Sequence, residues 1–243
     1  MTFHPSITPL PLFPEFVVHR GMMVSEQDDA SLKIPLPYQL KNAVSRRRAE
    51  FICGRLCARE ALKLLEAPCL DIPMGADRSP IWPSGFVGSI THSEDMAFAA
   101  VARTEQAQSL GLDVEKRMSR DTALELAPIL ATSDEYDRLL HPPWDHPLLT
   151  TALFSAKETI FKCLYPVIKR QFDFTDVEIT SFDTKDGTFS FALSRSISEL
   201  LPAASHHCGR VAIVDNLVHT GTVLTTTNPP SSKTEPGHFN AYC

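Results

Sequence analysis

Apolar residues recur at helical spacing in two long segments of the chain. The first covers about residues 45–66, and four of its apolar positions, spaced seven, four and three residues apart, share one helical face: Phe51, Ala58, Leu62 and Leu65. Ser45 is a suitable N-cap for this helix. The second segment, about residues 148–164, is expected to end before Pro166. A further helical region is expected over residues 122–140.

Short apolar segments between these helices predict β-strands, at residues 86–90, 96–102, 111–115, 177–179, 188–193 and 210–215. Each half of the chain then holds one long helix and several strands. The two halves, residues 1–110 and 111–218, are therefore similar in content and length. Residues 219–243 are rich in Thr, Ser, Pro and Asn, and we expect them to form a flexible tail.

Composition narrows the class of protein. The 243 residues are 43% apolar and 21% charged, which is typical of a globular chain. The net charge of −6 argues against general nucleic-acid binding, because that function needs a positive surface. No apolar run approaches the roughly 20 residues of a transmembrane helix, and the proline-rich start is unlike a secretory signal. Six scattered cysteines without a C-x-x-C pair favour reduced thiols, so we expect a cytoplasmic protein.

Three carboxylates are candidates for chemistry. Asp113 and Glu115 alternate with apolar residues in a predicted strand and therefore share one face, although a solvated strand face would look the same. Glu158 falls on a helical stripe with three aromatic residues, which predicts a buried carboxylate that needs a partner. A surface ion pair with Lys162 is the alternative. Together the three acidic residues would suit Mg²⁺ and a phosphate-using reaction.

Basic residues cluster on the first long helix. Three arginines lie on one border of its apolar face, where they could bind phosphate or form a solvated stripe: Arg48, Arg55 and Arg59. Arg46 and Arg47 precede them and could meet an acidic partner. His92 follows a glycine-containing strand and is either a phosphate contact or an ordinary polar residue.

Five segments in this order resemble one family. They are Arg48-x-Glu50-Phe51-x-x-Gly54-Arg55, Pro80-x-Trp82-Pro83-x-Gly85, Gly88-Ser89-Ile90-Thr91-His92, Gly111-Leu112-Asp113-Val114-Glu115 and Phe154-Ser155-Ala156-Lys157-Glu158-x-x-x-Lys162. Residues 45–170 thereby resemble the Sfp-type 4′-phosphopantetheinyl transferases, and within them the enterobactin synthase component D subgroup. The resemblance implies an α+β fold of two similar halves about a pseudo-twofold axis, with coenzyme A bound in the cleft between them. It also implies Mg²⁺-dependent transfer of phosphopantetheine from coenzyme A to a serine of an apo carrier protein, with release of adenosine 3′,5′-bisphosphate.

The resemblance assigns roles to individual residues. It implies three ligands for Mg²⁺: Asp113, Glu115 and Glu158. We expect Glu158, or a metal-bound water next to it, to be the base, and Lys162 would act beside the pyrophosphate. The residues implied to contact coenzyme A are Arg48, Arg55, Arg78, Thr91, His92, Asp113 and Lys162. His92 would lie at the 3′-phosphate.

Some features depart from the family or leave the function open. Residues 20–45 offer only Lys33 and Lys41 where members use lysines near the cofactor, and the segment after His219 has no family counterpart. A non-catalytic coenzyme A or nucleotide-binding regulator is the alternative function, and a metal-dependent phosphohydrolase is a third. We expect a monomer whose partner is an acidic carrier domain, and the subgroup points to siderophore or nonribosomal peptide assembly.

Overall fold

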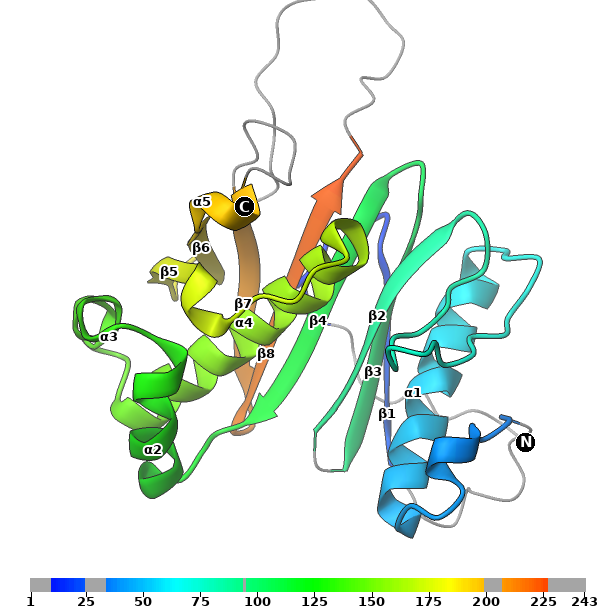
Figure 1. Cartoon of the computed structure of the whole chain (residues 1–243), viewed down its shortest axis with the longest axis horizontal. Coiled ribbons are helices and arrows are strands. Elements are labelled where there is room, and N and C mark those ends of the chain that lie inside the picture. Colours follow the sequence, from blue (N-terminus) through cyan, green and yellow to red (C-terminus); the bar gives the residue numbers. More distant parts are fainter. Residues whose placement is uncertain (1–9, 25–33, 94, 199–206, 227–243) are drawn as a thin grey trace, which may run out of the picture.

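The computed structural model describes residues 10–24, 34–93, 95–198 and 207–226 (Figure 1). They form two antiparallel sheets, each covered by one long helix, which confirms the α+β class. Within these ranges no helix is both long enough and apolar enough to cross a membrane.

The N-terminal half is a three-stranded sheet with the order β1-β3-β2. Its strands are β1 (Val18–Met23), β2 (Phe86–Ser93) and β3 (Met96–Arg103). Helix α1 (Ser45–Leu64) packs on this sheet and buries small and apolar side chains against it, and the 3₁₀ turn η2 (Tyr38–Leu40) precedes it. The apolar face predicted for this helix is confirmed, because Ala58 and Leu62 are fully buried.

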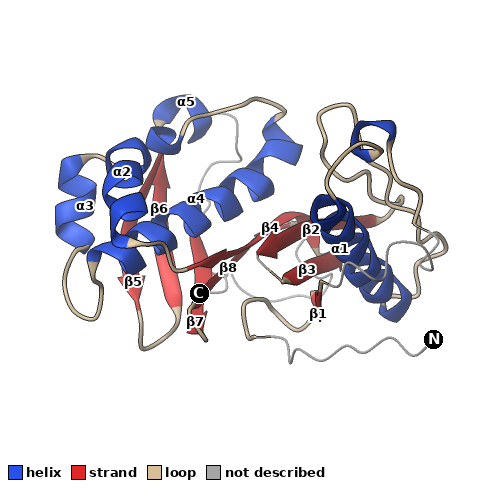
Figure 2. Ribbon diagram, turned by 90° about the horizontal axis from the view of Figure 1, so that it is seen from below, coloured by secondary structure: helices blue, strands red, loops and turns tan. Residues whose placement is uncertain are grey.

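The C-terminal half is a five-stranded sheet with the order β4-β8-β7-β6-β5. Its strands are β4 (Ala107–Lys116), β5 (Val177–Asp183), β6 (Thr188–Leu193), β7 (Cys208–Val214) and β8 (Leu217–Thr225). Its helices are α2 (Arg120–Leu130), α3 (Ser133–Leu139), α4 (His146–Ile168) and α5 (Arg195–Ser198), with the 3₁₀ turn η3 (Phe174–Asp176). Figure 2 shows α2, α3 and α4 on one side of this sheet.

The two halves meet where β2 lies beside β4. The backbone N–H of Leu112 donates to Oγ of buried Ser89 at 3.1 Å, which ties β4 to β2. Helix α4 crosses β4 at Gly111, where an added Cβ would lie 1.9 Å from the carbonyl oxygen of Thr159. Only glycine permits this approach, and it brings the side chains of α4 next to those of β4.

The expected tail begins later than the sequence suggested. Residues 217–225 form β8, which pairs with β4 and β7, and Val218 and Thr220 are fully buried. The threonines that suggested a loop are β-branched and suit a strand instead. Residues 227–243 of that tail, and Lys33, lie outside the described residues. The expected boundary between residues 110 and 111 falls inside β4, and β1 was not foreseen.

Several helix ends also differ from expectation. Val44 occupies the N-cap position of α1, so Ser45 is not its cap. Helix α4 continues through Pro166 and ends two residues later, at Ile168, so only the last residues of the helix follow the proline. The region expected to be helical, residues 122–140, holds two helices, α2 and α3. Thr132 has an extended backbone between them, and its side chain caps the N-terminus of α3.

The thiols are only partly as expected. Four of the described cysteines are not disulfide-bonded: Cys53, Cys57, Cys69 and Cys163. Cys208, however, is disulfide-bonded, so the expectation of reduced thiols is wrong there. Spacing along the chain does not reveal which sulfurs approach one another in the folded protein.

Candidate active site

The candidate site is built where β2, β4 and α4 come together. Lys162 of α4 forms an ion pair with Asp113 of β4, with Nζ 2.5 Å from Oδ1. The hydroxyl of Thr91 on β2 donates to the same oxygen at 3.1 Å. Lys162 also donates to Thr91 Oγ1 and to the carbonyl of Leu112, each at 3.4 Å. Three residues implied by the resemblance, from both halves of the chain, therefore form one cluster.

Asp113 is buried although it lies on the polar face of its strand. Leu112 and Val114 face the core as expected and are fully buried, while β2 and α4 cover the opposite side of β4. Its second oxygen, Oδ2, is also buried and accepts no hydrogen bond from any described residue. A buried carboxylate oxygen without a donor is costly, and it is the kind of group that a bound cation would satisfy.

The other two carboxylates share this environment. The pKa of Glu115 is raised to about 8: burial is the largest cause, the negative charges of Asp113 and Glu158 act in the same direction, and Lys162 opposes them. Burial likewise raises the pKa of Glu158; Lys162 opposes this shift, and Asp113 adds to it. Each of these carboxylates makes ionisation of the others less favourable, because their negative charges are concentrated in one region.

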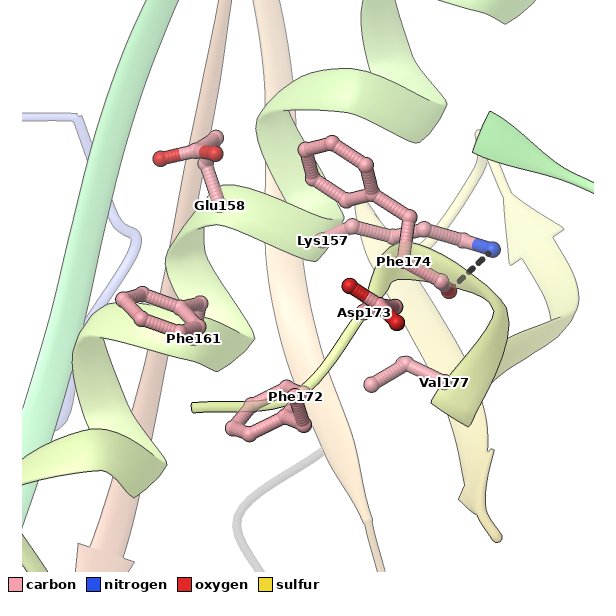
Figure 3. Close-up of a pocket in the computed structure, with 7 residues that line it drawn as sticks. All are labelled: Lys157, Glu158, Phe161, Phe172, Asp173, Phe174 and Val177. Carbon is pink, nitrogen blue, oxygen red and sulfur yellow. Dashed lines mark hydrogen bonds between the residues drawn. The ribbon is translucent and has the colours of Figure 1, made fainter. Parts of the chain in front are cut away.

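Glu158 faces a pocket rather than the core, and this corrects the expectation of a buried stripe. Its aromatic companions on α4 are only half-buried, because the core-facing side of the helix carries other residues, among them Ala156 and Ile160. The pocket beside Glu158 has a volume of about 190 Å³ (Figure 3). Its lining residues come from α4 and from the segment before β5: Lys157, Glu158, Phe161, Phe172, Asp173, Phe174 and Val177.

The donor set fits a hard divalent cation. Asp113, Glu115 and Glu158 offer oxygen atoms alone, and Asp113 Oδ2 is buried without a donor. Oxygen-only sets suit Mg²⁺, which commonly keeps water and phosphate among its ligands. In the part of the chain that the structure describes, no three acidic, histidine or cysteine side chains already stand at metal-binding spacing.

His92 lies at the end of β2, within the strand rather than after it. Its Nε2 is hydrogen-bonded to the guanidinium of Arg47, and its Nδ1 lies 3.5 Å from Oε2 of Glu50. Burial lowers the pKa of His92; Glu50 opposes this shift, and the charges of Arg47 and Lys162 add to it. A neutral imidazole beside arginine can accept hydrogen bonds and leaves the guanidinium charge available to an anion.

The arginines implied to bind the cofactor lie in different surroundings. Arg48 is half-buried and donates to the carbonyl of Ala43 at 2.8 Å. Arg55 is buried over the ring of Phe51 and donates to the carbonyl of Ile72 at 3.3 Å, and burial lowers its pKa to about 10.

Arg78 lies in an exposed loop of the N-terminal half. It adopts the left-handed backbone region, with φ 67°. Hydrogen bonds from Ser79 hold the pKa of its neighbour Asp77 below the usual value, and Tyr165 and Lys169 at the C-terminal end of α4 act in the same direction. The loop of the N-terminal half that carries Arg78 therefore reaches the C-terminal end of α4.

Sequence reasoning missed the residue that contacts His92. Arg47 was assigned to a partner surface, yet it hydrogen-bonds His92 and Glu50. Its separation of three from Glu50 was a usable signal, because residues three apart on a helix are neighbours. The contact with His92, 45 residues away, has no local signature.

Comparison with known proteins identifies the family. A model described as the 4′-phosphopantetheinyl transferase N-terminal domain matches residues 36–102, and one described as the 4′-phosphopantetheinyl transferase superfamily matches residues 109–213. Enterobactin synthase component D of Salmonella typhimurium is 41% identical over 132 residues, which are 54% of this chain and 54% of that protein. The match thus spans about half the length of that relative.

Two further relatives match over more of the chain. 4′-Phosphopantetheinyl transferase Svp of Streptomyces mobaraensis is 34% identical over 189 residues, 75% of this chain and 74% of that protein. 4′-Phosphopantetheinyl transferase PptT of Mycobacterium tuberculosis is 32% identical over 204 residues, 78% of this chain and 86% of that protein. The two family models match strands of both sheets, and the comparisons confirm the resemblance drawn from the five motifs: the chain belongs to the 4′-phosphopantetheinyl transferase superfamily.

Proposed function

We propose that this protein transfers the 4′-phosphopantetheine arm of coenzyme A to a serine hydroxyl of an apo carrier protein. Membership of the family supports this proposal. The observation that carries it is the cluster of Asp113, Lys162 and Thr91, which joins both halves and adjoins Glu115 and Glu158. Such a cluster can place both a cationic charge and a proton acceptor next to a bound diphosphate.

The reaction is a substitution at the β-phosphorus of coenzyme A. The serine oxygen forms a bond to this phosphorus, and the bond to the bridging oxygen of the pyrophosphate breaks. Adenosine 3′,5′-bisphosphate leaves with that oxygen. Glu158 takes the serine proton, and its raised pKa makes it a stronger base than an exposed glutamate. The ammonium of Lys162 stabilises the charge on the departing bisphosphate.

Asp113, Glu115 and Glu158 would hold Mg²⁺ in this site. The bound ion supplies positive charge to the pyrophosphate oxygens. Asp113 is suited to this role because Oδ1 is held by Lys162 and Thr91 while Oδ2 accepts nothing from the described residues. The carboxylate is thereby fixed in orientation before any ligand arrives.

The two ends of coenzyme A fit different parts of the site. His92 and Arg47 offer a ring nitrogen and a guanidinium for the 3′-phosphate, more than 40 residues apart in sequence but in direct contact. The pocket beside Glu158 has apolar walls of three phenylalanines and Val177 next to the charged Lys157, Glu158 and Asp173, and these apolar walls suit the uncharged pantetheine arm. Three arginines remain candidate contacts for the phosphates of coenzyme A: Arg48, Arg55 and Arg78.

The carrier protein needs a basic surface on a chain whose net charge is −6. Arg46 is half-exposed on α1, where it lies 3.4 Å from Glu50 and 3.6 Å from Asp95. We infer that Arg46 contributes to the approach of an acidic carrier, while Arg47 serves His92 instead.

One assay tests the proposed function. The protein is incubated with coenzyme A, Mg²⁺ and an apo carrier, and the intact mass of the carrier is measured. Transfer adds one phosphopantetheine group to the carrier and supports the proposal. Consumption of coenzyme A without modification of the carrier indicates a phosphohydrolase, and binding without consumption indicates a regulator; either result would refute it.

A further inference from the structure

Lys157 is a lysine whose side chain is completely buried. It precedes Glu158 on α4, but the two side chains leave the helix on different sides (Figure 3). Its ammonium donates to the carbonyl of Leu130 at 2.6 Å and to that of Phe174 at 3.1 Å. It also lies 3.0 Å from Oε1 of Glu135. An ammonium has three N–H donors, so every donor of Lys157 has a partner.

These partners belong to different elements of the C-terminal half. Leu130 ends α2, Glu135 lies in α3, and Phe174 lies in η3. Glu135 also accepts the backbone N–H of Ile179 on β5 at 2.8 Å. One buried ion pair therefore holds four elements against α4.

One of these contacts belongs to the wall of the candidate pocket. The carbonyl of Phe174 that binds Lys157 lies in the segment 172–177, which lines the pocket opposite Glu158 and Phe161. The ring centroids of Phe172 and Phe161 are 5.1 Å apart, and those of Phe174 and Phe154 are 5.9 Å apart. Lys157 anchors the backbone of this wall to α4, and the anchored backbone in turn positions the rings of Phe172 and Phe174.

We propose that Lys157, together with Glu135, is a positioning residue that holds the segment 172–177 at the distance from Glu158 that the bound substrate arm requires. This inference rests on the proposed function. Lys157 borders the pocket, but its ammonium is directed away from Glu158 and all its donors are taken, so it acts through the wall. A buried ion pair is poor evidence of stabilisation by itself, because a matched apolar pair is often as stable. Its value here is that it fixes one arrangement of four elements.

The informative variant is the double substitution Lys157→Met with Glu135→Gln. Methionine keeps the length of the side chain, and glutamine can still accept the N–H of Ile179, so no unpaired charge remains buried. The bond to Phe174 is lost. The control is Arg138→Met, because Arg138 also joins α3 to β5, through Glu178 at 2.8 Å, but on the exposed surface.

Two measurements test the role of Lys157. Hydrogen–deuterium exchange of the full chain should become about tenfold faster in residues 172–177 and stay unchanged in β2 and β3, because only the anchored wall loosens. The KM for coenzyme A should rise about tenfold with a smaller change in kcat, because the arm loses a preformed wall. The control should match the wild type in both.

The outcomes separate this inference from the proposed function. If the wild-type protein transfers nothing, the proposed function fails, while exchange still decides whether Lys157 anchors the wall. Wild-type exchange in residues 172–177 of the double variant would overturn the inference, and so would an unchanged KM. If the double variant does not fold, Glu135→Gln alone must show the same two changes at smaller size, and wild-type values there would overturn the inference.

Discussion

The ammonium of Lys162 lies 2.5 Å from Oδ1 of Asp113 and leaves Oδ2 of the same carboxylate without a donor among the described residues. The pair joins α4 to β4, and Thr91 of β2 hydrogen-bonds the same oxygen. One carboxylate can therefore carry an internal ion pair and still offer an oxygen to a cation. This arrangement makes Asp113 the residue on which the proposed chemistry depends most.

Replacing Asp113 by alanine should abolish most of the turnover. The change removes a proposed Mg²⁺ ligand and leaves Lys162 without its anion, so we expect a loss of about 10²-fold or more in kcat. Transfer to an apo carrier, followed by intact mass, measures the effect, and circular dichroism checks folding. Near wild-type turnover in a folded variant would refute the metal assignment.

His92→Ala should weaken the binding of coenzyme A without slowing the chemistry. The proposed contact is remote from the reacting phosphorus, so we expect KM to rise about tenfold while kcat at saturation is retained. Arg47→Ala should act similarly, and the double variant should cost less than the two losses combined, because the side chains are hydrogen-bonded. A lower kcat with unchanged KM would contradict this role.

The pH dependence of stability should carry a signature of His19. His19 is buried without a hydrogen-bond partner for either ring nitrogen among the described residues, and burial lowers its pKa to about 4. In the unfolded chain the imidazole takes up a proton as the pH falls below about 6.5, whereas in the folded protein it stays neutral down to about pH 4. The free energy of unfolding is therefore highest above pH 6.5. It falls as the pH drops toward 4, by about 3 kcal/mol in total.

His19→Phe should remove this part of the pH dependence. Phenylalanine suits the site, because the imidazole packs against the rings of Phe13 and Phe98. Urea unfolding between pH 4 and pH 8 gives the free energy of unfolding of both proteins. Identical slopes below pH 6.5 would show that His19 is not the titrating group.

Gly111→Ala should destabilise the protein, because a Cβ would lie 1.9 Å from the backbone oxygen of Thr159. Forcing α4 away from β4 should cost about 3 kcal/mol in the free energy of unfolding. Gly85→Ala is the control: its Cβ meets nothing within 4 Å, and only its positive φ opposes the change, at about 1 kcal/mol. Thermal unfolding measures both, and equal effects would contradict the close packing of α4.

Arg46→Glu should slow modification of an acidic carrier in a salt-sensitive way. Arg46 is half-exposed, so its field is screened by salt, and the effect should be severalfold at low ionic strength and small at about 0.5 M salt. The KM for coenzyme A should not change. Equal rates of the variant and the wild type at low salt would remove Arg46 from the proposed carrier surface.

The sequence by itself determined the local features of the site. Alternation in residues 111–115 placed Leu112 and Val114 in the core and Asp113 on the opposite face, because side-chain direction in a strand depends only on position. Helical spacing likewise located α1 and α4. The order of five short motifs indicated the family that the comparisons confirm.

The tertiary structure decided which of these groups meet. Lys162 reaches Asp113 across 49 residues, Arg47 reaches His92 across 45, and Lys157 reaches Glu135 across 22. Periodicity showed Glu158 on an aromatic stripe, but only the packing of α4 shows that this stripe borders a pocket. Local patterns fix the direction of a side chain, whereas its partner depends on how distant elements pack, and no short-range pattern encodes that packing.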